Sequence, residues 1–197
     1  RLYTYGVRSR ERRSAQTAMH VMADGLTRLL APILPVTADQ LWTSLPGTRV
    51  ESVHIAVFPR DADLRALENP ELVDRWNHLI EIRELVLAEI EPLRKDKRIG
   101  SSLQARVVIA APRATTLGIL QQHAKDLPML LIVSDVEVRP GSEAAGAPPQ
   151  VTIERAGGVR CDRCWRYVPA VSNEPAWAGL CERCQDALVS GPREAPV

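Results

Sequence analysis

Two short stretches, CDRC at residues 161–164 and CERC at residues 181–184, decide how the end of this chain folds. They contain all four cysteines of the 197 residues. A tetrahedral metal ion needs four ligands that converge from two directions, and two tight Cys-x-x-Cys turns can supply them from a short piece of chain. The spacing therefore predicts one zinc ion per chain, held by Cys161, Cys164, Cys181 and Cys184.

Other uses of the four cysteines are less consistent with this pattern. A pair of disulfides or a redox dithiol does not suit a chain expected in a reducing compartment. Iron would fit the same four thiolates, and the sequence leaves zinc and iron open, although zinc is the usual occupant of a closed structural site. The four histidines have no partner at ligand spacing and are interpreted as ordinary surface or core residues: His20, His54, His78 and His123.

Apolar periodicity predicts that the first hundred residues are mainly helical. Residues 12–31 carry an apolar residue every three or four positions, which predicts a helix with these residues on one stripe, ending at Pro32 and Pro35. Thr37 and Gln40 match a capping box and predict a second helix to about residue 45. The predicted stripe consists of Ala15, Ala18, Met19, Met22, Leu26, Leu29 and Leu30.

A third helix is predicted to begin at Asn69, with Pro70 as its first residue, and Pro92 should end or kink it. Residues 47–68 read as a linker with a short extended piece at residues 53–58. Trp42 and Trp76 lie on the apolar faces of their helices and are expected in the core.

The pattern changes after Gly100. Residues 105–110, 133–138 and 151–154 read as strands, residues 115–131 as helical, and residues 141–149 as a loop. The expected class is α+β. Its expected parts are a helical region at residues 1–100, a small α/β unit at 101–156, a four-cysteine zinc finger at 157–190 and a tail at 191–197.

The charge is balanced overall, with a net charge of +1, but two segments are strongly basic. The first is residues 1–13, and the second contains Arg94, Lys95, Lys97 and Arg98. Arginine suits bidentate phosphate contacts, although its use throughout the chain is equally explained by genome composition. No apolar run is long enough to span a bilayer and no secretory signal is present, so we expect a cytoplasmic protein without a membrane partner.

Trp165 follows the second cysteine directly and has an arginine on each side. An aromatic ring on a rigid metal knuckle could stack on an unpaired base while the neighbouring guanidinium groups meet phosphate. It could equally pack the small finger, which has little other core. The sequence leaves both interpretations open.

Three motifs in series resemble the C-terminal region of bacterial isoleucyl-tRNA synthetases. The CDRCW and GLCERC stretches at residues 161–165 and 179–184 are similar to the zinc finger of that family. LLAPILP at 29–35 with TADQLW at 37–42 resembles its helical anticodon-binding region, and KRIGSSLQA at 97–105 resembles the link into its α/β unit. The resemblance covers essentially the whole chain.

This resemblance implies binding of the anticodon arm of tRNA(Ile) in protein biosynthesis. It also implies a monomeric parent isoleucine-tRNA ligase whose ATP-dependent catalytic and editing domains lie upstream. No signature of a class I nucleotide-binding fold is present, so we expect no catalytic residue here and no isoleucine activation by this chain alone. The residues predicted to contact RNA are Arg8, Arg10, Arg12, Arg13, Arg163, Trp165 and Arg183.

Two other classes of function fit parts of the sequence. A DNA-repair glycosylase has a similar cysteine finger, but it uses an N-terminal proline as nucleophile, whereas this chain begins with arginine and helices. A zinc-stabilised scaffold for protein interactions, with weak or no RNA binding of its own, is the stronger alternative because the net charge is close to zero.

Overall fold

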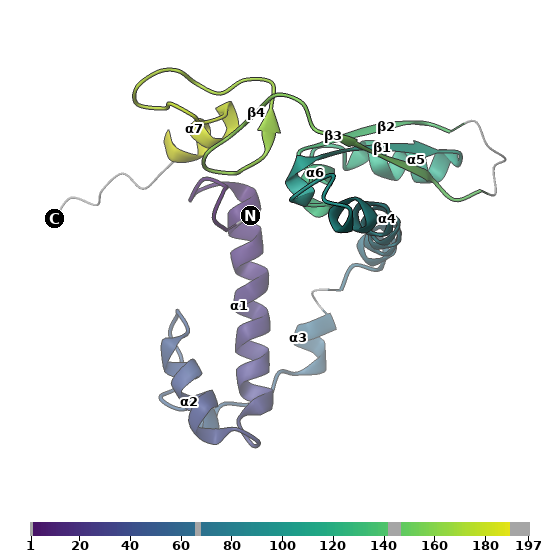
Figure 1. Cartoon of the computed structure of the whole chain (residues 1–197). Helices are drawn as coiled ribbons and strands as arrows, with labels where there is room; N and C mark the ends of the chain where they lie inside the picture. Colours follow the sequence, from purple (N-terminus) through teal and green to yellow (C-terminus); the bar gives the residue numbers. More distant parts are fainter. Residues whose placement is uncertain (1, 66–67, 142–146, 190–197) are drawn as a thin grey trace. The chain divides into compact units, whose positions relative to one another are not determined.

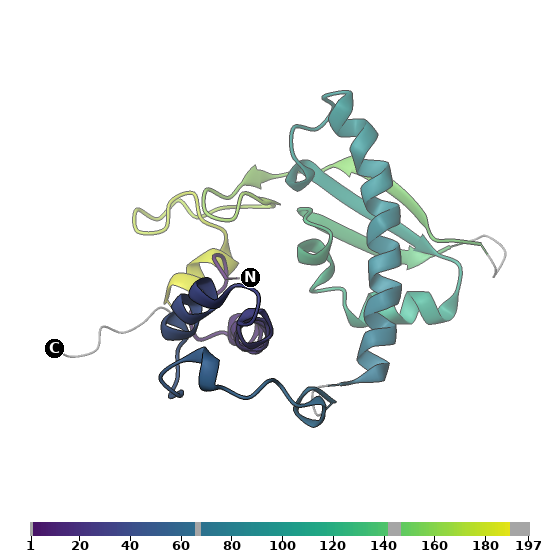
Figure 2. The same cartoon turned by 90° about the horizontal axis from the view of Figure 1, so that it is seen from below.

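The computed structural model describes residues 2–65, 68–141 and 147–189, which are coloured along the sequence in Figures 1 and 2. The chain forms two compact units, one from Arg1–Glu68 with Asp186–Val197 and one from Asn69–Gln185. Helices and small sheets occur together, so the predicted α+β class is confirmed. The predicted tail and most of the predicted loop at 141–149 lie outside the described residues.

The first unit begins with the long helix α1 (Arg10–Leu30), close to its predicted bounds. The hydroxyl of Ser9 caps it by accepting a hydrogen bond from the backbone N–H of Arg12 at 3.2 Å. Helix α2 (Pro35–Ser44) begins two residues before Thr37. The predicted capping box at Thr37 and Gln40 is therefore wrong. Pro35 starts the helix because its fixed φ and missing N–H suit the first helical position.

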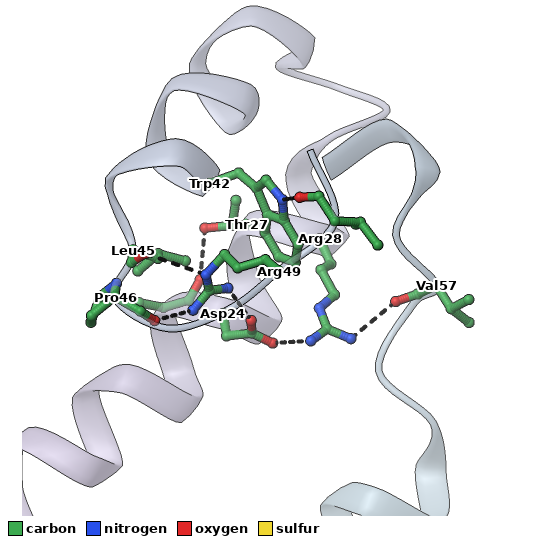
Figure 3. Close-up of polar contacts among 10 residues, drawn as sticks. Asp24, Thr27, Arg28, Trp42, Leu45, Pro46, Arg49 and Val57 are labelled. Atoms are coloured by element: carbon green, nitrogen blue, oxygen red, sulfur yellow. Dashed lines mark hydrogen bonds and ion pairs between the residues drawn. The ribbon is translucent and has the colours of Figure 1, made fainter. Parts of the chain in front are cut away.

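Trp42 forms the centre of this unit and is 3% exposed, so the prediction that it lies in the core is confirmed. Its indole N–H donates to the carbonyl of Val50 at 2.8 Å. Figure 3 shows Arg28 and Arg49 beside the ring, and their guanidinium carbons lie 5.5 and 4.8 Å from its centroid. Asp24 accepts from both arginines at 2.5 and 2.8 Å, which fixes α1 against the turn after α2.

The apolar stripe of α1 is mostly exposed in the described part of the chain. Met22, Leu26 and Leu29 are each more than half exposed, and Thr27 is the buried residue of this helix. Helix α2 and the short 3-10 turn η1 (Val53–Ile55) pack against the side of α1 that carries Asp24, Thr27 and Arg28 instead. The 3-10 turn also replaces the extended piece predicted at residues 53–58, and the short helix α3 (Asp61–Arg65) follows it.

The second unit begins with helix α4 (Pro70–Lys95), which starts as predicted. The side chain of Asn69 accepts from the N–H of Leu72 at 3.0 Å, and Pro70 is at the start of the helix. Pro92 lies in the final turn of α4 and does not end the helix, which continues to Lys95. The carbonyl of Pro92 accepts a hydrogen bond from the N–H of Asp96 at 2.9 Å. The buried residues of α4 are Leu79, Ile82, Val86 and Ile90.

A three-stranded sheet of β1 (Ala105–Ala111), β2 (Asp135–Pro140) and β3 (Gln150–Arg155) packs against α4. Its order is β2-β1-β3, with β2 parallel and β3 antiparallel to β1. The helical segment predicted between the first two strands is two helices, α5 (Ala114–Gln122) and α6 (Leu127–Leu130), because a turn separates them before Pro128. The α/β core joins Trp76 and the buried residues of α4 to Val107, Ile109, Leu120, Leu127, Leu131 and Val133.

The opposite side of the sheet carries charge. Arg106 on the central strand bonds to Asp135 and Glu154 on the two outer strands at 3.1 and 3.0 Å, and also to Glu137. Among the described residues, no helix has the length and apolar character needed to cross a bilayer.

Candidate metal centre

The first cysteine pair lies on a hairpin of two short strands, β4 (Val159–Arg160) and β5 (Tyr167–Val168). Cys161 follows β4 directly, and its N–H donates to the carbonyl of Arg166 at 2.9 Å. The N–H of Trp165 donates back to the carbonyl of Cys161 at 2.8 Å, so the chain turns sharply after Cys164. This turn places both sulfurs on one side of the hairpin tip.

The second pair lies at the start of helix α7 (Glu182–Val189). Cys181 precedes the helix and Cys184 belongs to its first turn, where the N–H of Cys184 donates to the carbonyl of Cys181 at 2.9 Å. Gly179 has a φ of +77°, a conformation that favours glycine, and its carbonyl accepts from the N–H of Asp162 at 3.0 Å. This contact brings the second pair against the first.

The four sulfurs converge on one point. They lie within 4.8 Å of one another, and Cys164 Sγ is 3.8 Å from Cys181 Sγ. A tetrahedron with zinc–sulfur bonds of about 2.3 Å has sulfurs roughly 3.8 Å apart, so the cluster has the size that zinc requires. All four cysteines are thiols without a disulfide, and three of them are buried.

The electrostatics of the cluster differ from one sulfur to the next. Burial opposes ionisation of Cys161, but the backbone groups of Cys164, Cys181 and Arg163 outweigh it and lower the pKa of this thiol to about 6. Burial raises the pKa of Cys184 to about 12 and also raises the pKa of Cys181. The lowered pKa of Cys161 favours its thiolate, whereas Cys181 and Cys184 must lose their protons when a metal binds.

Two arginines of the finger lie beside these sulfurs. The guanidinium group of Arg163 donates to Cys184 Sγ at 3.7 Å. Burial tends to lower the pKa of Arg183, but hydrogen bonding to Cys164 and the charges of the sulfurs raise it. Both residues are predicted RNA contacts that directly precede a cysteine in the sequence, and the structure shows that they interact with Cys184 and Cys164.

Ser134 joins the finger to the α/β unit, and no pattern in the sequence pointed to this residue. It is 2% exposed, and its hydroxyl donates to the carbonyl of Leu103 at 2.5 Å. The same hydroxyl accepts from the N–H of Tyr167 at 2.6 Å, while the guanidinium group of Arg166 donates to the Ser134 carbonyl. These partners are more than thirty residues apart in the chain, so only the fold could bring them together.

Trp165 is the exposed aromatic residue of the knuckle. Its side chain is 61% exposed, and its φ of +62° lies in the left-handed region that bulky residues rarely adopt. The side chain therefore does not pack the interior of the finger. The small core there consists of the cysteines with Val168, Val171 and Leu180.

The remaining predicted RNA contacts lie at the N-terminal end of α1, in the first compact unit. Arg8, Arg10 and Arg13 are exposed, and Arg12 is partly buried. Glu11 is the acidic residue of the first helical turn. No other group of three or more potential metal ligands occurs in the described part of the chain.

A closed cluster of four cysteine sulfurs is typical of a structural zinc finger. Residues 158–187 match the zinc finger found in FPG and IleRS. Residues 1–109, more than half of the chain, match the anticodon-binding domain of tRNA ligase. The chain belongs to the anticodon-binding domain family of tRNA ligases, which confirms the predicted resemblance.

Relatives with similar sequences support the same family. The isoleucine-tRNA ligase of Syntrophotalea carbinolica is 40% identical over 95% of this chain and 21% of its own length. Those of Neisseria meningitidis and Natranaerobius thermophilus are 39% and 36% identical over 94% and 95% of this chain. The chain spans about a fifth of the length of these curated relatives.

Proposed function

We propose that this chain binds the anticodon arm of tRNA(Ile) as part of an isoleucine-tRNA ligase, which acts in the cytoplasm as a monomer. The observation that carries the proposal is the match to the anticodon-binding domain of tRNA ligase, together with relatives that are isoleucine-tRNA ligases. Activation of isoleucine and editing belong to other domains of such a protein.

The proposed zinc ion is one per chain and is bound by Cys161, Cys164, Cys181 and Cys184. Zinc would hold the knuckle and α7 together where the finger has little apolar core. No coordination position would remain open, so the metal would shape the RNA-binding surface and take no part in catalysis.

The arginines around the start of α1 support a contact with phosphate. The N-terminus of a helix carries partial positive charge, so Arg8, Arg10, Arg12 and Arg13 lie where cations do not stabilise the helix. An RNA phosphate would be attracted by both the guanidinium groups and the helix end. Such contacts would position the stem without reading its sequence.

Trp165 supports a contact with an unpaired base. An exposed indole ring in a left-handed backbone conformation costs free energy in the isolated chain, and stacking on a base would offset that cost. We propose that Trp165 stacks on an anticodon nucleotide, while Arg163 and Arg183 act mainly on the sulfurs and only their outer N–H groups reach RNA.

The test is a fluorescence-anisotropy titration of the zinc-loaded chain with tRNA(Ile) and with an unrelated tRNA at two salt concentrations. Tighter and salt-dependent binding to tRNA(Ile) is expected. Trp165→Ala should weaken that binding by about tenfold, since stacking of one base contributes roughly 1–3 kcal/mol. Trp165→Phe keeps a stacking ring and should lose much less.

The alternative is a scaffold that holds neighbouring protein domains and does not bind RNA by itself. The near-neutral net charge favours this alternative. Absent binding, or equal binding of both tRNAs with little dependence on salt, would support the scaffold and contradict independent anticodon recognition.

A further inference from the structure

The end of α4 and the turn that follows it concentrate positive charge. Residues 94–98 read Arg-Lys-Asp-Lys-Arg, with four basic residues and one acidic residue, which gives +3 where the whole chain carries +1. All five side chains are exposed. Two of the three lysines of the chain, Lys95 and Lys97, are found here. We name Arg94, Lys95, Lys97 and Arg98 the basic turn.

Helix stability explains only part of this charge. Cations in the last helical turn interact favourably with the negative end of the helix, which accounts for Arg94 and Lys95. Lys97 and Arg98 lie beyond the final helical residue. The four like charges also repel one another, so helix stability gives no reason for the full set.

The backbone of Lys97 is strained. Its φ is +56°, and the turn forms a Schellman motif in which the N–H of Arg98 donates to the carbonyl of Leu93 at 2.9 Å. The N–H of Lys97 itself donates to the carbonyl of Arg94 at 3.1 Å. Glycine is the usual residue at this position because a side chain is unfavourable in a left-handed conformation. A lysine at a position that favours glycine points to a use for its charge.

The ammonium and guanidinium groups of the basic turn are available to an anion. Lys95, Lys97 and Arg98 make no ion pair with any acidic side chain in the described ranges. Arg94 pairs with Glu91 at 3.2 Å, and both side chains are 51% exposed. Arg94, Lys95 and Lys97 line a depression of about 320 Å³ together with Glu91, Ile99 and Gly100.

We propose that the basic turn is a further binding site for backbone phosphates of tRNA, made by other residues than those of the cysteine finger and the start of α1. This inference rests on the proposed function, because the polyanion that it would bind is the same RNA. Strongly hydrated lysine ammonium groups act as point charges toward phosphate, so the contact adds affinity and does not read sequence.

Lys97→Gly separates the role of the charge from the role of the fold. Glycine removes one charge and relieves the left-handed strain, so we expect the melting temperature to rise by about 2 °C. At the same time, the affinity for RNA should fall roughly fivefold, and the slope of log affinity against log salt should decrease by about one. A variant that folds better and binds worse would show that the lysine serves binding.

Three further variants control this result. Lys97→Gln should lose the same affinity without the gain in melting temperature, and Lys97→Arg should keep the affinity. Lys125→Gln removes the charge of an exposed lysine in the turn between α5 and α6, and should change neither quantity. An equal loss of affinity in Lys125→Gln and Lys97→Gln would overturn the site, because net charge alone would then explain the effect.

Two RNA hairpins separate this inference from the proposed function. One has the sequence of the anticodon arm of tRNA(Ile), and the other has the same length with a scrambled loop. A phosphate contact predicts that Lys97→Gly weakens both hairpins by the same factor. If the wild-type chain binds both hairpins equally and Lys97→Gly weakens both, anticodon reading fails but the phosphate site stands.

The converse result is equally informative. If the wild-type chain prefers the anticodon hairpin and Lys97→Gly binds it as tightly as the wild type does, the proposed function stands and the phosphate site is overturned. A wild-type chain that binds neither hairpin at low salt overturns both.

Discussion

Arg163 is predicted to contact RNA, but its guanidinium group donates to Cys184 Sγ. Four thiolates around Zn²⁺ carry a net charge of −2, and a guanidinium group 3.7 Å from one sulfur offsets part of it. We expect Arg163→Gln to increase the rate of zinc loss to a chelator by about tenfold, the scale found for partners of metal ligands. A coloured chelator measures this rate directly.

Arg160→Gln is the matched control, because Arg160 is an exposed arginine of the same hairpin. It should leave the rate of zinc loss unchanged. If Arg163→Gln keeps its zinc as firmly as the control does but binds RNA less tightly, then Arg163 belongs to the RNA-binding surface and its contact with sulfur is incidental.

At the scale of the element, the β4–β5 hairpin depends on Gly158. Its φ is +89°, and a Cβ at this position would lie 2.1 Å from the backbone carbonyl oxygen of Val168 on the opposite strand. Gly158→Ala must therefore separate the strands, and we expect it to destabilise the finger by about 2 kcal/mol or more. Zinc affinity measured by competition should fall with it.

The neighbouring glycine provides the comparison. A Cβ at Gly157 would meet no atom within 4 Å, so Gly157→Ala should change zinc affinity little. Equal zinc affinities in the two variants would mean that the metal tolerates a distorted hairpin and that the close approach at Gly158 is not needed.

At the scale of the whole molecule, the three hydrophobic cores of the described residues differ in how they are held together. The core around Trp42 and the core of the α/β unit contain no cysteine, whereas the core of the finger consists mainly of its cysteines. Removal of zinc by a chelator should therefore unfold residues 158–187 and leave most of the helical circular dichroism intact. Amide NMR signals would show which residues lose their structure.

Acid should have the same local effect as chelation. Cys184, with its pKa raised to about 12, and Cys181, also raised, are protonated in the metal-free chain at neutral pH, so zinc must displace their protons. The thiol of Cys161, with a pKa of about 6, adds a further competing proton as the pH falls through that value. Apparent zinc affinity should therefore decrease steadily from about pH 8 to pH 6, and an affinity that stays constant over this range would contradict the assignment of the four thiols as ligands.

The sequence alone predicted the features that depend on a few neighbouring residues. Asn69 and Pro70 predicted the start of α4, the change of period predicted the strands, and the two Cys-x-x-Cys pairs predicted the sulfur cluster. In each case the backbone geometry depends on neighbouring residues, such as a cap within one turn or two thiols on one tight loop.

Only the tertiary structure decided which face of α1 is buried, which partner Arg163 takes, and how Ser134 fastens the finger to the sheet. It also showed that Lys97 adopts a left-handed conformation where a glycine would be less strained. Periodicity could propose an apolar stripe for α1, but another face is inside, because α2 and η1 pack against it and Asp24 pairs with Arg49, 25 positions away. The stabilisation that comes from partners far apart in the sequence cannot be read from any short stretch, because these contacts form only once the chain has folded.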